Sequence, residues 1–298
     1  MPKPLRPITT GTDWARTVAE PIMLDGGLAT ELEAQGQDLS SALWSARLLT
    51  DDPASIVAAH LAYFEAGAQV AITASYQAPL ELIGSSVRLA QQARDHHGRP
   101  DRWIAGSVGP YGASRADGSE YHGHYGLSVA DLRVWHRPRI EQLAAAGADV
   151  LALETVPCLA EVEALLAEVA GTGLPAWLSI TCAGDRTRAG EPAGEAFAMA
   201  RDVDEVLAVG VNCTDPRDAT GLVRAAAASG KPVVIYPNSG ESWDAIERRW
   251  VGEPAFRVED VQQWVDDGAR LIGGCCRVGP AQIAALVGQV RSTAPPHH

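Results

Sequence analysis

Three cysteines near the ends of two predicted strands could hold a catalytic metal ion. Cys213 follows the apolar run Ala208–Asn212, and the adjacent pair Cys275 and Cys276 follows Leu271–Gly274. Three thiolates are a familiar ligand set for zinc, and a catalytic zinc keeps its fourth position for water or substrate. The pattern therefore favours one zinc ion shared by the two strand ends.

The adjacent pair can share one ion only where the chain leaves the strand, because neighbours on a regular strand point to opposite faces. Gly273 and Gly274 precede the pair and are expected to supply that bend through the conformational freedom of glycine. Two other interpretations stay open at this point. The cysteines could pack as small apolar side chains, or the pair could form a strained redox disulfide.

Polar and aromatic side chains follow several other predicted strands. Asp25 precedes a Gly-Gly pair, Glu154 ends the run Val150–Glu154, Asn238 follows Tyr-Pro, and Tyr76 follows Thr-Ala-Ser. Acids suit the ammonium group of an amino acid, amides suit its carboxylate, and an aromatic ring could face a cationic donor. The alternative is that each acid caps the next helix and that the tyrosine belongs to the core.

These residues need a frame that brings strand ends together, and the sequence predicts one. Short apolar runs alternate with helix-like stretches such as Ala54–Ala66, which is typical of parallel strands with helices packed outside. The eight runs are Pro21–Asp25, Val70–Ala74, Trp103–Val108, Val150–Glu154, Ala176–Thr181, Ala208–Asn212, Val233–Pro237 and Leu271–Gly274.

A repeated Gly-Ala pair supports this count. Gly67, Gly147 and Gly268 each precede an alanine just before a predicted strand, where a left-handed glycine would close the preceding helix. We predict a single-domain α/β protein, a (β/α)8 TIM barrel, with an open doubly wound sheet as the alternative. The expected organisation is an N-terminal extension over residues 1–20, the barrel over 21–290 and a disordered tail over 291–298. The segment Gly112–Gly126 is expected to be a long loop on the active side.

Composition and charge limit the partners. The net charge of −13 leaves no broad basic surface for nucleic acid or an anionic membrane. We expect a cytoplasmic protein, since the chain shows neither a secretory signal nor a long apolar segment. Five cysteines are too few and too uneven for a disulfide framework, and Cys158 and Cys182 are expected to be structural. No nucleotide-binding glycine motif is present, and His122 and His124 are expected to be solvated.

Taken together, the motifs resemble one known family over residues 22–290, in the order that the family has. They are Asp25-Gly26-Gly27, Ser75-Tyr76-Gln77-Ala78, Gly109-Pro110-Tyr111-Gly112-Ala113, Ala116-Asp117-Gly118-Ser119-Glu120-Tyr121, Leu153-Glu154-Thr155, Gly210-Val211-Asn212-Cys213, Tyr236-Pro237-Asn238-Ser239-Gly240-Glu241 and Gly273-Gly274-Cys275-Cys276. The chain is similar in these motifs to the homocysteine S-methyltransferases.

The resemblance implies a (β/α)8 barrel with one zinc ion per chain on Cys213, Cys275 and Cys276. It implies that the sulfur of homocysteine takes the open zinc position, with Asp25 and Glu154 near its amino group, and that methionine is made. The chain looks like the short bacterial and plant branch, whose methyl donor is S-methylmethionine and sometimes S-adenosylmethionine. Two other functions remain as alternatives: a barrel lyase or aldolase acting on a small carboxylate, and a zinc- or redox-sensing thiol protein.

Overall fold

The computed structural model describes residues 20–39, 44–99, 101–244 and 249–293. Its main sheet has eight strands, and every pairing between neighbours in it is parallel. The sheet order is β1-β12-β9-β8-β5-β4-β3-β2, so each strand lies beside the next main-sheet strand along the chain. The strands are β1 (Ile22–Met23), β2 (Val70–Ile72), β3 (Trp103–Val108), β4 (Val150–Val156), β5 (Ala176–Ile180), β8 (Val206–Asn212), β9 (Val233–Tyr236) and β12 (Ala269–Ile272).

The sheet closes on itself between its first and last members. Leu24 forms a parallel bridge with Val70, and the amide of Asp25 donates a hydrogen bond of 3.0 Å to the carbonyl of Val70. On its other side, β1 pairs with β12. An open doubly wound sheet has two free edges, so this closure confirms the predicted (β/α)8 barrel.

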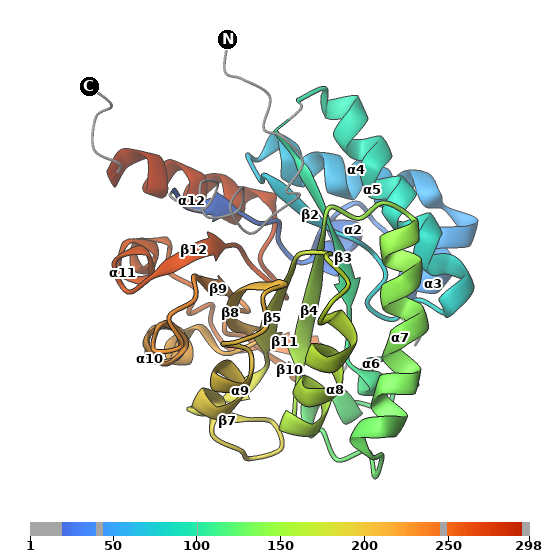
Figure 1. The fold of residues 1–298 in the computed structure, drawn as a ribbon. Coiled ribbons are helices and arrows are strands. Elements are labelled where there is room, and N and C mark those ends of the chain that lie inside the picture. Colours follow the sequence, from blue (N-terminus) through green and yellow to red (C-terminus); the bar gives the residue numbers. More distant parts are fainter. Residues whose placement is uncertain (1–19, 40–43, 100, 245–248, 294–298) are drawn as a thin grey trace.

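Helices form the outer layer around the strands (Figure 1). Their apolar faces pack on the sheet, as in α4, whose start is capped by the Asp52 side chain accepting from the amide of Ser55. Gly67, Gly147 and Gly268 all have positive φ, which confirms the expected helix-to-strand turn. The described helices are α2 (Leu28–Ala34), α3 (Trp44–Asp51), α4 (Pro53–Glu65), α5 (Ile83–His97), α6 (Tyr111–Arg115), α7 (Val129–Ala145), α8 (Leu159–Val169), α9 (Ala193–Met199), α10 (Pro216–Ala227), α11 (Val261–Asp266) and α12 (Pro280–Thr293), with short 3-10 turns η1 (Leu80–Leu82), η2 (Ser119–Tyr121) and η3 (Val258–Asp260).

Buried apolar side chains form two clusters. The larger lies between strands and helices, and the smaller fills the barrel with large rings from Trp103, Trp177 and Tyr236 among aliphatic side chains. The barrel interior is thus a packed core, and a ligand must bind at its mouth.

The structure departs from the sequence expectations at several boundaries. The last main-sheet strand is β12 (Ala269–Ile272), so Gly273 and Gly274 already lie outside the strand. Residues 291–293, expected in the tail, belong to α12. Residues 1–19 of the expected extension and 294–298 of the tail lie outside the described residues.

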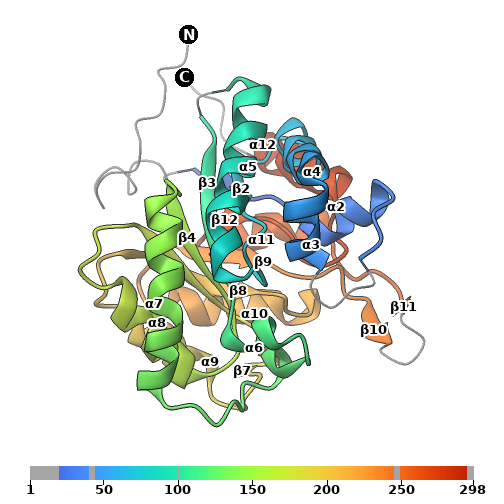
Figure 2. The ribbon, with the colours of Figure 1, turned by 90° about the vertical axis from the view of Figure 1, so that its right-hand side faces the viewer.

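Four short strands were not predicted. They form two hairpins, β6 (Cys182–Ala183) with β7 (Arg186–Thr187) and β10 (Ser242–Asp244) with β11 (Arg249–Val251). The second hairpin projects from the body of the barrel (Figure 2). Across the described ranges, no helix combines the length and the apolar character that crossing a membrane requires.

Candidate metal centre and active site

A cavity of about 270 Å³ opens where the carboxyl ends of the strands meet. Its wall combines residues at or just after the ends of β1, β2, β4, β8, β9 and β12 with residues of the segment after β3. This is the end of a (β/α)8 barrel where ligands bind. The side chains in the wall that carry chemistry include Tyr76, Glu120, Tyr121, Glu154, Tyr236, Arg277 and the three cysteines Cys213, Cys275 and Cys276.

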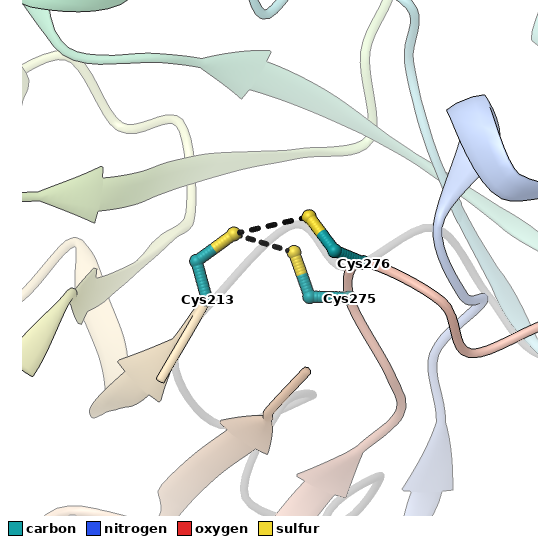
Figure 3. Close-up of side chains that lie close together, drawn as sticks. All are labelled: Cys213, Cys275 and Cys276. Carbon is teal, nitrogen blue, oxygen red and sulfur yellow. Dashed lines mark hydrogen bonds between the residues drawn. The ribbon is translucent and has the colours of Figure 1, made fainter. Parts of the chain in front are cut away.

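The three cysteines converge on one point of this wall (Figure 3). The sulfur of Cys213 lies 2.7 Å from that of Cys275 and 3.9 Å from that of Cys276, and all three sulfurs are within 4.8 Å of one another. Sulfurs at 2.3 Å from a tetrahedral zinc ion would be about 3.8 Å apart. The side chains fit a three-thiolate metal site, as the sequence predicted.

The three sulfurs influence one another's ionisation. Hydrogen bonds from Cys213 and then Cys275 hold the pKa of Cys276 well below its usual range, whereas contact with Cys213 and Cys276 raises the pKa of Cys275. One thiolate is thus tolerated, but three thiolates this close repel one another unless a cation lies among them. Their proximity favours a bound metal.

Backbone contacts hold each cysteine in place. Cys213 has a φ of 48°, a left-handed conformation that is uncommon outside glycine, and its carbonyl accepts a hydrogen bond of 3.1 Å from the hydroxyl of Thr181. The amide of Cys275 donates to the carbonyl of Pro237 at 2.8 Å. The amide of Cys276 donates to Oδ1 of Asn238 at 3.1 Å. Asn238 therefore holds the cysteine segment, a contact that the sequence did not predict.

The glycines before the cysteine pair act through their size rather than through a special φ. A Cβ on Gly273 would lie 2.6 Å from the carbonyl oxygen of Asp25, and a Cβ on Gly27 would lie 2.6 Å from that of Cys275. The expectation of a bend from glycine freedom is corrected here, since neither Gly273 nor Gly274 has positive φ. Positive φ occurs instead at Arg277, with a value of 66°.

Glu154 lies in the cavity wall with both carboxyl oxygens bonded. Oε1 accepts from the hydroxyl of Ser107, and Oε2 accepts from the hydroxyl of Tyr236 at 3.1 Å. Burial raises the pKa of Glu154 to about 7, although both hydrogen bonds act in the opposite direction. Its protonation state is therefore balanced near neutral pH.

Asp25 lies deeper than Glu154. It is 2% exposed, and Oδ2 accepts from the amide of Ile72 at 2.8 Å. Oδ1 has no hydrogen-bond partner among the described residues. Burial raises the pKa of Asp25 well above its usual value, and the charge of Glu154 adds to this. Within the described part of the chain, neither Asp25 nor Asn238 belongs to the cavity wall.

Two polar groups behind Glu154 escaped sequence reasoning. The hydroxyl of Tyr236 accepts from Nε1 of Trp177 at 3.1 Å and lies 2.6 Å from Oγ of Ser179. Neither Tyr236 nor Trp177 was predicted to have a role from the sequence, because only the barrel brings them together at the carboxylate. Their contacts fix the orientation of Glu154.

A second pair stiffens the cavity wall between β4 and β8. Oδ1 of Asn212 accepts from the amide of Thr155 at 2.7 Å, and Nδ2 of Asn212 donates to the hydroxyl of Thr155 at 2.7 Å. Thr155 has a φ of 58°. Non-glycine residues with positive φ gather at functional sites, and Thr155, Cys213 and Arg277 all lie in this wall.

Of the other residues considered in the sequence, some line the cavity and some lie away from it. Tyr76 lines the cavity. His122 and His124 are exposed, as expected. Cys158 and Cys182 are buried, and desolvation raises the pKa of each to about 12, as suits structural thiols.

The segment after β3 contributes more than the loop that was expected. It contains α6 and η2, and it places Glu120 and Tyr121 in the cavity wall. No role was predicted for these two residues, although they stand in one of the motifs that carried the resemblance. Their position in the cavity wall depends on how the whole segment packs over the mouth of the barrel, which the local sequence does not reveal.

Comparisons with known proteins agree with this geometry. A model of the family described as "Homocysteine S-methyltransferase" matches residues 22–290. The chain is 45% identical to homocysteine S-methyltransferase 4 of Zea mays, over 90% of this chain and 89% of the relative. It is also 45% identical to the homocysteine S-methyltransferase of Escherichia coli, over 89% of this chain and 94% of that protein.

A solved structure extends the agreement to the fold. The metallated form of the homocysteine methyltransferase MmuM from Escherichia coli superposes with a TM-score of 0.83 at 39% identity, covering 95% of this chain and 100% of that one. The match spans the barrel and the cysteine segments, so the resemblance seen in the sequence is confirmed. The chain belongs to the homocysteine S-methyltransferase family.

Proposed function

We propose that this protein transfers a methyl group from a sulfonium donor, S-methylmethionine ahead of S-adenosylmethionine, to the sulfur of L-homocysteine, giving methionine. The observation that carries the proposal is the convergence of three cysteine sulfurs in a cavity wall that also holds Glu154. Membership of the family and the metallated relative support it. A lyase or aldolase would have no use for three converging sulfurs.

Cys213, Cys275 and Cys276 would hold one zinc ion per chain. Bound there, zinc would supply the positive charge that lets the acceptor thiol, with an ordinary pKa near 8.5, lose its proton at neutral pH. The softness of three sulfur ligands favours zinc over magnesium or calcium, which prefer oxygen.

The chain's own residues would bind the acceptor. The carboxylate of Glu154, held by Ser107 and Tyr236, would attract the ammonium group of homocysteine, while Asp25, buried outside the cavity wall, would act on that group only from behind Glu154. Arg277 is the one cationic side chain among the described residues of the wall, and it suits the acceptor's carboxylate. Asn238 would act indirectly, by holding the amide of Cys276.

Methyl transfer then needs only alignment of the two substrates. The methyl carbon of the donor must lie roughly 3–3.5 Å from the acceptor sulfur, in line with the bond that breaks. A new sulfur–carbon bond forms on homocysteine while the donor's sulfonium–methyl bond breaks, and the donor leaves as a neutral thioether. The thiol proton goes to solvent, so the step requires no oxidant or base from the protein.

Three thiols that must stay reduced require a reducing compartment. We therefore propose a cytoplasmic location, where glutathione and thioredoxin keep thiols reduced.

Initial rates test the proposed reaction and its donor together. Metal-loaded protein is given homocysteine with S-methylmethionine, S-adenosylmethionine or betaine at equal concentrations, and methionine formation is followed. We expect S-methylmethionine to react fastest and betaine at least 100-fold more slowly, because a sulfonium sulfur is a better leaving group than a tertiary amine. No methionine from any donor would reject the function, while a preference for betaine would reject only the donor.

A further inference from the structure

We propose that Glu120 and Tyr121 bind the cationic sulfonium end of the methyl donor and set the specificity of the enzyme for a charged donor. This inference rests on the proposed function and adds the residues that recognise the donor. It comes from a part of the wall that the acceptor residues do not use.

Glu120 is a buried carboxylate with unused bonding capacity. It is 7% exposed and lines the cavity, and its Oε2 has no hydrogen-bond partner within the described residues. A buried carboxylate without a partner is costly unless a cation or donor group reaches it. The cavity is where such a group can arrive.

Tyr121 lines the same cavity as this carboxylate and the cysteines, and the charges of both act on its hydroxyl. The Tyr121 side chain is 54% exposed, so its ring is open to a ligand in the cavity. Tyr76 also lies near Cys213, Tyr121 and Glu120, since the charges of all three act on its hydroxyl.

The segment that carries Glu120 and Tyr121 is anchored to the barrel by contacts of its own residues. At its start, the amide of Tyr111 donates to Oε1 of Glu161 at 2.6 Å, and the ring of His136 bonds to the same oxygen at 2.9 Å. Further along, a Cβ on Gly112 would lie 2.4 Å from the amide nitrogen of Glu120, so the two parts of the segment pack closely. The backbone that carries the Glu120 carboxylate is thus packed against the start of the segment.

The reaction geometry separates the donor's charge from the acceptor sulfur by the methyl group. With the methyl carbon roughly 3–3.5 Å from the acceptor sulfur, the sulfonium centre lies on the far side of that carbon, where Glu120 and Tyr121 of the same cavity would meet it. A carboxylate attracts it through charge, and tyrosine rings attract it through their faces. The attraction ends when the donor becomes a neutral thioether, so the same residues would favour product release.

Removing the charge of Glu120 tests this role. In Glu120→Gln we expect the KM for S-methylmethionine to rise at least tenfold while the KM for homocysteine changes less than twofold. Calorimetric titration of the metal-loaded protein should show the same loss of donor affinity without turnover. Glu163→Gln removes one charge from the exposed face of α8 and is the matched control, which should leave both constants unchanged.

A second variant keeps the inference testable if Glu120→Gln fails to fold. Tyr121→Leu changes a half-exposed side chain, and we expect a threefold or greater rise in the donor KM with the melting temperature unchanged. Unchanged donor KM and affinity in either folded variant would overturn the inference, as would a rise confined to homocysteine. If the wild-type protein forms no methionine, the proposed function fails, but donor affinity measured by calorimetry still decides the role of Glu120.

Discussion

The inner and outer walls of the cavity differ in how they hold their carboxylates. On the inner wall, at the end of β4, both oxygens of Glu154 accept hydrogen bonds from side chains of the barrel. On the outer wall, in the segment after β3, Oε2 of Glu120 has no partner in the described part of the chain. The Glu154 carboxylate is therefore pre-organised to bind the methyl acceptor. The Glu120 carboxylate stays available to the methyl donor, which loses its positive charge during the reaction.

The lack of a partner does not by itself mark a ligand site. His60 in α4 is fully buried, and neither of its ring nitrogens has a partner among the described residues. It lies in the helical layer, away from the cavity wall. Glu120 differs because the cavity gives a ligand access to it. Substitutions in the cysteines, the inner wall and the helical layer should therefore have different effects.

The largest loss of activity is expected from substitution of the cysteines at the proposed metal site. Cys213→Ser or Cys275→Ser should lower methyl transfer at least 1000-fold and reduce bound metal below 0.1 equivalent, since one of three thiolate ligands is lost. The melting temperature without metal should change by less than about 3 °C, because the site sits at the barrel mouth. Cys158→Ala, at a buried structural thiol, is the control and should keep both metal and activity.

An intermediate effect is expected on the inner wall. Glu154→Gln should raise the KM for homocysteine roughly 10–100-fold, the range for losing a charged hydrogen bond of about 1.5–3 kcal/mol, with the donor KM unchanged. Kinetics with each substrate varied in turn measure this. An equal rise in both constants would erase the distinction between the two walls.

The pH dependence of the same carboxylate sharpens this test. Because burial raises the pKa of Glu154 to about 7, the group is ionised above that pH and protonated below it. The attraction for an ammonium group is thus lost as the pH falls below 7, and the KM for homocysteine should rise more steeply in the wild-type protein than in Glu154→Gln. Parallel profiles for the two proteins would contradict the assigned role.

The smallest effect on function is expected in the helical layer. Desolvation lowers the pKa of His60 from 6.5 to about 4, so the unfolded chain binds a proton that the folded chain does not bind between these values. The free energy of unfolding should therefore fall by about 3 kcal/mol as the pH drops from 6.5 to 4. Denaturant titration should show that His60→Leu removes this loss, with both KM values kept within twofold.

His96→Leu provides the control for that comparison, because His96 is exposed on α5. It should leave the acid-induced loss of stability in place. A change in either KM for His60→Leu would mean that the helical layer and the cavity are coupled.

The sequence predicted the parts of the fold that follow from chain periodicity. Apolar runs, alternating helices and the Gly67, Gly147 and Gly268 turns were enough to predict eight strands and their order around the barrel. The predicted run Leu271–Gly274 ended two residues beyond β12, because Gly273 and Gly274 continue the apolar run and their amides still bond to the carbonyls of Ile235 and Asp25.

Some residues of the site could also be predicted from the sequence, and others could not. The cysteines could be predicted because their residue type limits what chemistry they do. Tyr236 and Trp177 could not, since their hydroxyl and indole groups meet only across the barrel interior, 59 positions apart in the chain. Glu120 needed the folded segment after β3, whose helical turns carry no strong periodic signal in a stretch rich in glycine and serine.

Metal titration of stripped protein tests the central claim most directly. The protein is depleted of metal with a chelator under reducing conditions, and zinc is added back while methionine formation from homocysteine and S-methylmethionine is followed. We expect no activity without metal, a linear rise on addition of zinc, and a plateau at one equivalent per chain. Full activity of the stripped protein, or a plateau far from one equivalent, would contradict it.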